Sequence, residues 1–110
     1  DLRGADLSSA NLREINLRGA DLSEANLNEA DLTGANLQNA NLQGAYLIKA
    51  YLIKTNLKES NLTKAYLTGA YLTKSDVSQA NLSGAYLNNS KITGTIMTGT
   101  YYDQTTHFDT

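Results

Sequence analysis

The 110-residue sequence contains no cysteine, no proline and no tryptophan, and its only histidine is His107. Without cysteine the chain forms no disulfide and offers no thiolate, and its redox compartment stays undetermined. A lone histidine assembles neither a metal cluster of His and Cys ligands nor a His-based catalytic triad. We therefore expect no cofactor, no metal site and no enzymatic activity.

Long apolar runs and a strong excess of one charge are also missing. The short runs predict neither a transmembrane helix nor a signal-peptide hydrophobic region. The net charge of -2 gives no basic surface for nucleic acid. The chain begins at Asp1, within a repeat and without Met, as expected for an excerpt or for a chain that has lost a processed segment or tag. Its location is open: the cytoplasm, or the periplasm or thylakoid lumen if a signal was removed.

The chain is a single small domain built from one five-residue phrase, Ala-(Asp/Asn)-Leu-x-x. The central leucine recurs without interruption from Leu2 to Leu72, and apolar centres continue as far as Met97. The residue two positions before each centre is small, with Ile15 as the bulky exception. A five-residue period suits neither a helix nor a long strand. The small-x-Leu alternation instead predicts a short extended piece with two inward side chains, followed by a corner.

Corner chemistry and repeat spacing predict how the chain closes. All eight glycines lie two residues after a centre, the third position of a turn, where a type II turn requires positive φ. Where Glu or Lys occupies that position, we expect another turn type or left-handed φ at a cost of about 1 kcal/mol. A spacing of four quintets aligns Tyr46 with Tyr66 and Tyr86, and Tyr51 with Tyr71. This favours four quintets per coil, and a rod roughly 26 Å long at about 4.8 Å per coil.

The phrase resembles the consensus of the pentapeptide-repeat family from Asp1 to about Gly99. The resemblance implies an all-β fold, a right-handed quadrilateral parallel β-helix (a pentapeptide-repeat solenoid) with about five coils of four quintets each. Residues 1–100 would form this β-helix and residues 101–110 a C-terminal cap. The run from Tyr101 to Phe108 resembles the closing segment of cyanobacterial members.

Function is expected on the outward positions, because Leu and the small residues fill the inside. Tyrosines gather there on two neighbouring faces, beside the only aliphatic residues found directly after a centre. Together they predict an exposed apolar patch for self-association or another protein, although the tyrosines could instead only stiffen the rod. The candidate residues are Tyr46, Ile48, Tyr51, Ile53, Tyr66, Tyr71 and Tyr86.

Charge is segregated along the chain as well. Residues 1–45 carry seven acids and three arginines, whereas residues 46–100 carry six lysines and two acids. Such a dipolar rod could pack head to tail or meet a charged partner, although random placement on a solvated surface explains the pattern nearly as well.

The preferred interpretation is a non-catalytic structural or protein-interaction rod, with no small-molecule substrate and no membrane insertion. Some family members mimic DNA and bind a type II topoisomerase such as gyrase, so the resemblance implies this alternative. The lysines disfavour it, because such a mimic is acidic along its length. An ice-binding surface is the third hypothesis, prompted by threonines on flat faces: Thr33, Thr68, Thr73 and Thr93.

Overall fold

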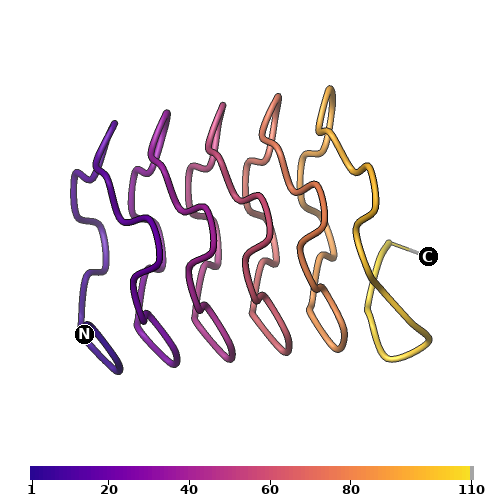
Figure 1. Cartoon of the computed structure of the whole chain (residues 1–110), viewed down its shortest axis with the longest axis horizontal. Coiled ribbons are helices and arrows are strands. Elements are labelled where there is room, and N and C mark those ends of the chain that lie inside the picture. Colours follow the sequence, from indigo (N-terminus) through magenta and orange to yellow (C-terminus); the bar gives the residue numbers. More distant parts are fainter. Residues whose placement is uncertain (110) are drawn as a thin grey trace.

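The computed structural model describes residues 1–109, and within them the chain winds into stacked coils of one shape (Figure 1). These residues contain no helix and no continuous strand, because each contact between coils is a single parallel bridge. Every bridge from Asp6↔Asn26 to Asn81↔Tyr101 joins residues four quintets apart. This confirms the predicted coil length. Coils 1 to 5 are residues 1–20, 21–40, 41–60, 61–80 and 81–100.

Each coil turns four times, once per quintet. The turn is closed by a hydrogen bond from the small residue to the preceding centre, as from the Ala5 N–H to the Leu2 carbonyl at 3.0 Å. The third turn residue has φ of 65–72° at the eight glycines and 56–61° at twelve other residues. Glutamate and lysine corners therefore adopt left-handed φ. The stacking holds them there, because the corner N–H bonds to the next coil, as from Glu14 to Thr33 at 2.9 Å.

The four corners divide the rod into four faces. We number them by their central residues in coils 1 to 5. Face 1 is centred on residues 2, 22, 42, 62 and 82; face 2 on 7, 27, 47, 67 and 87; face 3 on 12, 32, 52, 72 and 92; and face 4 on 17, 37, 57, 77 and 97. Outward side chains at one position of a face recur once per coil and form a row along the rod.

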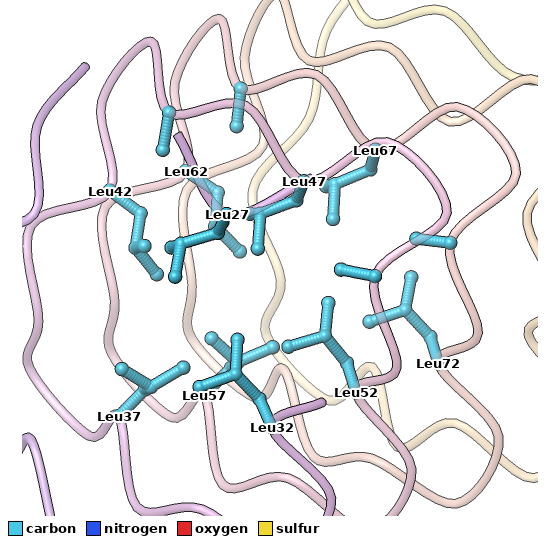
Figure 2. Close-up of a cluster of buried hydrophobic side chains, with 14 of the residues drawn as sticks. Leu27, Leu32, Leu37, Leu42, Leu47, Leu52, Leu57, Leu62, Leu67 and Leu72 are labelled. Atoms are coloured by element: carbon cyan, nitrogen blue, oxygen red, sulfur yellow. The ribbon is translucent and has the colours of Figure 1, made fainter. Parts of the chain in front are cut away.

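The central leucines project into the interior of the stack and form one continuous core (Figure 2). From Leu22 to Leu67 every central leucine is 0% exposed. Each buried leucine contributes roughly 1.5–3 kcal/mol. The centres of coil 1, Leu2 to Leu17, are only half-buried and pack against this core.

Three hydroxyl residues replace alanine inside the core, and each has a hydrogen-bond partner. Thr55 donates to the Leu32 carbonyl of the preceding coil at 2.8 Å. Ser60 and Ser75 donate to the carbonyls of Leu57 and Leu72, each at 2.7 Å. These bonds satisfy polar groups that are otherwise costly to bury.

The last described segment leaves the regular path, seen as the wider yellow loop in Figure 1. Tyr86 pairs with His107, one position later than the regular spacing, so the segment contains one residue more than a regular half-coil. The backbone of His107 still makes both regular hydrogen bonds. Its N–H donates to the Ala85 carbonyl at 2.8 Å, and its carbonyl accepts from the Leu87 N–H at 2.7 Å. Phe108 follows as the centre and packs against the core. Residues 101–109 thus continue over faces 1 and 2; Thr110, the end of the expected cap, lies outside the described residues.

Candidate interaction surface

The candidate tyrosines form two rows on the adjacent faces 2 and 3. On face 2 the ring centroids of Tyr46 and Tyr66 lie 4.9 Å apart, and those of Tyr66 and Tyr86 lie 5.1 Å apart. On face 3 the Tyr51 and Tyr71 centroids lie 4.9 Å apart. The stacked rings are parallel to within 4°. Since coil stacking sets this spacing, most ring faces cover one another and the ring edges face outward.

Both rows begin in coil 3, and their first rings are the most open. Tyr46 and Tyr51 are 41% and 42% exposed, whereas the later tyrosines are half-buried. The preceding coil carries the shorter Asn26 and Asp31 at the matching positions. A step in the outer surface therefore separates coil 2 from coil 3 on both faces.

Sequence reasoning missed that His107 extends the face 2 row. Its ring stacks on Tyr86 at 4.4 Å with an interplanar angle of 3°. The regular four-quintet spacing places Thr106, not His107, next to Tyr86 in the following coil. The extra residue therefore hid this contact in the sequence. Two features of the sequence could have indicated this contact: the aromatic ring of His107, and the apolar Phe108 that directly follows it.

Ile48 and Ile53 occupy the first turn position after their centres and are half-buried. Ile48 lies between Tyr46 and Tyr51 along the chain, at the corner of faces 2 and 3. Its N–H donates to Asn28 Oδ1 of the preceding coil at 2.8 Å. The structure thus places all seven candidate residues in coils 3 to 5 of two neighbouring faces.

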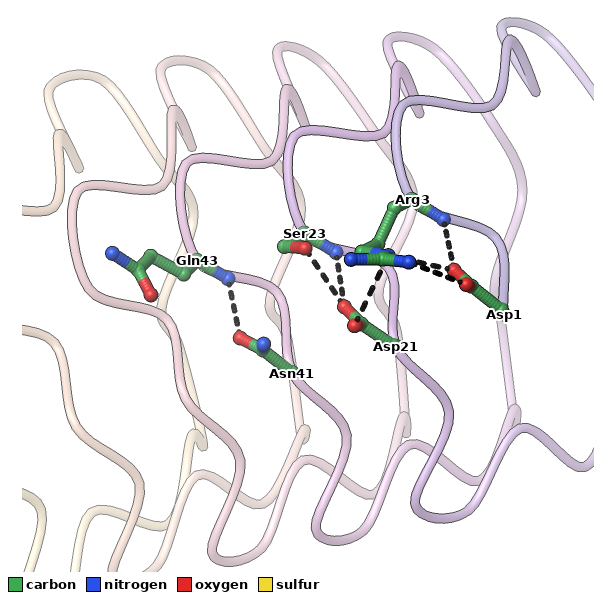
Figure 3. A network of polar contacts seen from close by, with 6 residues as sticks. All are labelled: Asp1, Arg3, Asp21, Ser23, Asn41 and Gln43. Atoms are coloured by element: carbon green, nitrogen blue, oxygen red, sulfur yellow. Dashed lines mark hydrogen bonds and ion pairs between the residues drawn. The ribbon is translucent and has the colours of Figure 1, made fainter.

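Away from the tyrosines, the residue before each Leu caps the turn. At these positions from Asp1 to Asn81, the side-chain Oδ1 of each Asp or Asn accepts a hydrogen bond from the backbone N–H of the residue two positions later. The N···O distances are 2.9–3.3 Å. Figure 3 shows Asp1, Asp21 and Asn41 doing so on face 1 of three consecutive coils. Within residues 1–109 no group of three His, Cys, Asp or Glu residues is arranged to hold a metal ion.

Capping also alters the acidity of these carboxyl groups. The Ser23 hydroxyl, at 2.8 Å, and then the Ser23 N–H donate to Asp21 Oδ1 and lower the pKa of Asp21 below its ordinary value. The Ser8 hydroxyl lowers the pKa of Asp6 in the same way. Hydrogen bonding favours the charged carboxylate, so both aspartates are ionised at neutral pH.

A tyrosine in the capping position supplies no cap to its own turn, although Asn28 of the preceding coil caps the turn after Tyr46. Within the described chain, the N–H groups of Ile53, Thr68 and Thr73 have no hydrogen-bond partner. The equivalent N–H elsewhere bonds to an outward Asp or Asn, so these donors also point outward. The tyrosine faces therefore combine apolar ring edges with backbone donors available to solvent or a partner.

Within coils 3 to 5, the charged side chains around these rows are all of one sign. In coils 3 to 5, faces 2 and 3 and the corners bounding them contain no acidic residue. Five of the six lysines lie there: Lys49, Lys54, Lys64, Lys74 and Lys91. The sixth, Lys58, is on face 4 and approaches Asp76 at 3.7 Å.

A second group of exposed apolar side chains lies where the repeat weakens. Ile92, Ile96, Tyr101 and Tyr102 are 45%, 49%, 56% and 57% exposed. Tyr102 meets Phe108 edge to face at 5.6 Å. The isoleucine in place of Asp or Asn at position 96 was the sequence signal for this group, which the candidate patch did not include.

The fold places the chain in the class of β-helical solenoids made of five-residue repeats. It belongs to the pentapeptide-repeat family: the family model described as Pentapeptide repeats (8 copies) matches residues 1–39, 40–79 and 60–99. None of the described residues forms a helix long and apolar enough to cross a membrane. No functionally curated protein matches the chain.

Solved structures of this family are similar to the chain. A pentapeptide repeat protein from the thylakoid lumen of Arabidopsis thaliana is 30% identical with a TM-score of 0.78, over 81% of this chain and 62% of that one. HetL, from the cyanobacterium Nostoc sp. strain PCC 7120 and involved in heterocyst differentiation regulation, is 23% identical with a TM-score of 0.60, over 97% and 77%. The matched region is thus less than two thirds of the plant protein's length.

Proposed function

We propose that the chain is a non-catalytic, right-handed quadrilateral rod that binds a protein partner through its tyrosine faces. We call this the tyrosine surface: Tyr46, Ile48, Tyr51, Ile53, Tyr66, Tyr71 and Tyr86. The observation that carries the proposal is the alignment of these rings in coils 3 to 5, where tyrosine replaces a turn cap and leaves outward N–H donors.

Physical chemistry supports a docking role for such a surface. Tyrosine provides a large contact area, loses little conformational entropy on binding, and retains a polar hydroxyl. Here stacking already restrains the rings, so a partner orders fewer side chains when it binds. The adjacent N–H groups of Ile53 and Thr73 can bond to carbonyl oxygens of a partner backbone.

The charge of the same faces favours a partner with acidic groups. Within coils 3 to 5, lysines and no acids lie around the tyrosine rows, so complementary charge would speed encounter and disfavour basic partners. This pattern also disfavours the DNA-mimic alternative, since coils 3 to 5 carry more lysines than acids.

The test replaces the two isoleucines of the surface, Ile48→Lys with Ile53→Lys, and measures self-association by sedimentation and partner capture from extracts of the source cell. Lys58 occupies the same turn position on face 4, so the fold accepts lysine there. We expect the double variant to lose binding while it keeps the native circular dichroism spectrum.

A matched control places lysine at the same turn position on face 1, as Gln43→Lys. Gln43 is exposed and lies outside the tyrosine surface. The control should keep the binding of the native chain. Equal self-association and equal capture by the native chain and the double variant would refute the proposal.

A further inference from the structure

Over coils 1 to 4, face 3 and its two corners carry opposite charges in the first two coils and in the next two. Coils 1 and 2 contribute Arg13, Glu14, Glu29 and Asp31, a net charge of -2. Coils 3 and 4 contribute only Lys49, Lys54 and Lys74, a net charge of +3. These glutamates and lysines are exposed and make no ion pair within residues 1–109. Each half of this face therefore presents unpaired charge of one sign.

The outward side chains of the same face also differ in size between coils 1 and 2 and coils 3 and 4. Its outward row carries the short Asn11 and Asp31 in coils 1 and 2, and the large Tyr51 and Tyr71 in coils 3 and 4. The two tyrosine rings stack on each other and form a raised strip, and Tyr51 is 42% exposed where this strip begins. A surface that is low and acidic at one end, and high and basic at the other, is complementary to itself when reversed.

We infer that face 3 binds a second copy of this chain, in an antiparallel dimer whose two-fold axis lies between coils 2 and 3. The inference rests on the proposed function, because it assigns a partner to the face 3 part of the tyrosine surface. A two-fold contact uses the same patch on both copies. Coil 1 of one copy then lies opposite coil 4 of the other, and coil 2 opposite coil 3.

This register brings opposite charges together at both corners. The two-fold axis runs across the rods, so each corner of one copy meets the same corner of the other. At the corner of faces 3 and 4, Glu14 meets Lys74 of the second copy, and Lys54 meets Gly34, which leaves room for its long side chain. At the corner of faces 2 and 3, Glu29 meets Lys49. Symmetry repeats each contact.

The outward rows match in the same register. Tyr51 lies opposite Asp31 of the second copy, and Tyr71 opposite Asn11, so the raised strip of each copy fills the low part of the other. A phenolic hydroxyl can donate to the carboxylate or amide oxygen that it meets. Because both rods have the same four-quintet coil, alignment of one pair of coils aligns the others.

The other faces do not offer this match. At the corner of faces 1 and 2, the same register places Glu24 opposite Gly44 and Lys64 opposite Gly4, which pairs no charges. At the corner of faces 4 and 1, it places Arg18 opposite Ser78, Lys58 opposite Gln38 and Glu59 opposite Asn39, which again pairs no charges. Self-complementarity is therefore a property of face 3.

A charge swap between two variants tests the dimer. One variant combines Lys49→Glu with Lys74→Glu, and the other combines Glu14→Lys with Glu29→Lys. Both residue types already occupy left-handed corners in this chain, so the fold tolerates the exchange. Each variant alone opposes like charges, and we expect at least roughly tenfold weaker association by sedimentation equilibrium. Mixed in equal amounts, the two variants restore every pair and should recover the native dimer.

Two controls make the result specific to face 3. The combination Glu24→Lys with Lys64→Glu alters the corner of faces 1 and 2 and should leave association unchanged. Raising the salt concentration should weaken the native dimer, because exposed charges are screened.

A native chain that sediments as a monomer at roughly millimolar concentration, or charge-swap variants that associate like the native chain, would overturn the dimer. Failure of the mixture to recover association would also overturn this register. None of these results decides the proposed function. A monomer that still captures a protein through Ile48 and Ile53 retains the docking role, whereas loss of both self-association and capture refutes both.

Discussion

Thr106 donates a hydrogen bond from Oγ1 to the carbonyl oxygen of Leu82 at 2.9 Å. Thr55, Thr95 and Thr100 make the same contact with a carbonyl 23 residues earlier, at 2.7–2.8 Å. The Thr106 bond spans 24 residues. Thr106 thus returns the chain to its regular position after the extra residue, and His107 follows in the aromatic row of face 2.

Removing this hydroxyl tests how strongly the last segment is held. We expect Thr106→Val to lower the free energy of unfolding by about 0.5–1.5 kcal/mol, because the hydroxyl bonds to both Leu82 and the Asp103 N–H. Thr98→Val is the matched control, since Thr98 is exposed and its hydroxyl has no protein partner within the described residues. Urea denaturation followed by circular dichroism measures both. Equal stability of the two variants would contradict an anchoring role for Thr106.

Glycine corners should differ in their tolerance of a side chain. Gly34 has φ +72°, and an added Cβ would lie 3.3 Å from Cγ of Glu14 in the preceding coil. We expect Gly34→Ala to destabilise the fold by about 1 kcal/mol through left-handed strain, with an added cost for moving Glu14. Gly4→Ala has the same kind of φ and no heavy atom within 4 Å, so its thermal unfolding should show the smaller loss. A larger loss for Gly4→Ala would contradict this account.

Stability should fall in acid because the capping aspartates become protonated. The pKa of Asp21 is held below its ordinary value of 3.8, chiefly by the Ser23 hydroxyl, so the folded state binds protons less readily than the unfolded state. This contribution is fully present above pH 3.8 and is lost as the pH falls through the lower folded pKa. Carboxyl titration by NMR, with denaturation at each pH, measures it.

The matched variant for this prediction is Asp21→Asn. Asparagine retains the Oδ1 acceptor, as Asn41 does one coil later. The variant should fold and show a weaker pH dependence in this range. An Asp21 pKa at or above 3.8 would rule out the assigned hydrogen-bond effect.

The chain should not act on type II topoisomerases. A DNA mimic needs continuous negative charge, whereas faces 2 and 3 of coils 3 to 5 and their corners carry five lysines and no acid. We expect no inhibition or protection in a gyrase supercoiling assay at micromolar protein. Exchange of these lysines for glutamate provides the comparison, and inhibition by the native chain would favour the DNA-mimic alternative.

The sequence predicts the stack well because its period and its geometry coincide. A four-quintet spacing aligns Tyr46 with Tyr66 and Leu22 with Leu42, and the structure pairs these coils in that register. Other features depend on forces that the pattern does not encode. Glu14 adopts φ 59° against its intrinsic preference because neighbouring coils bond to that corner. The Tyr86–His107 contact depends on one inserted residue, which breaks the periodicity from which it would be predicted.

The candidate surface follows from the same register, but its surroundings do not. The sequence places Tyr51 above Tyr71, and the rings do stack. It does not show that the N–H of Ile53 loses a cap when tyrosine replaces Asp or Asn, because the capping bond is visible only in three dimensions. It also aligns Glu29 with Lys49, although these two side chains form no ion pair in the described structure.

The four-cornered coil restricts how such a gene can change in length. Loss of one quintet between Tyr46 and Tyr86 would rotate all later residues by a quarter turn and separate the tyrosines onto different sides. Only a gain or loss of four quintets together, one full circuit, would keep the aromatic stripe continuous. Duplication of whole circuits is therefore the genetic event by which the aromatic region can lengthen and still lie on one side of the protein.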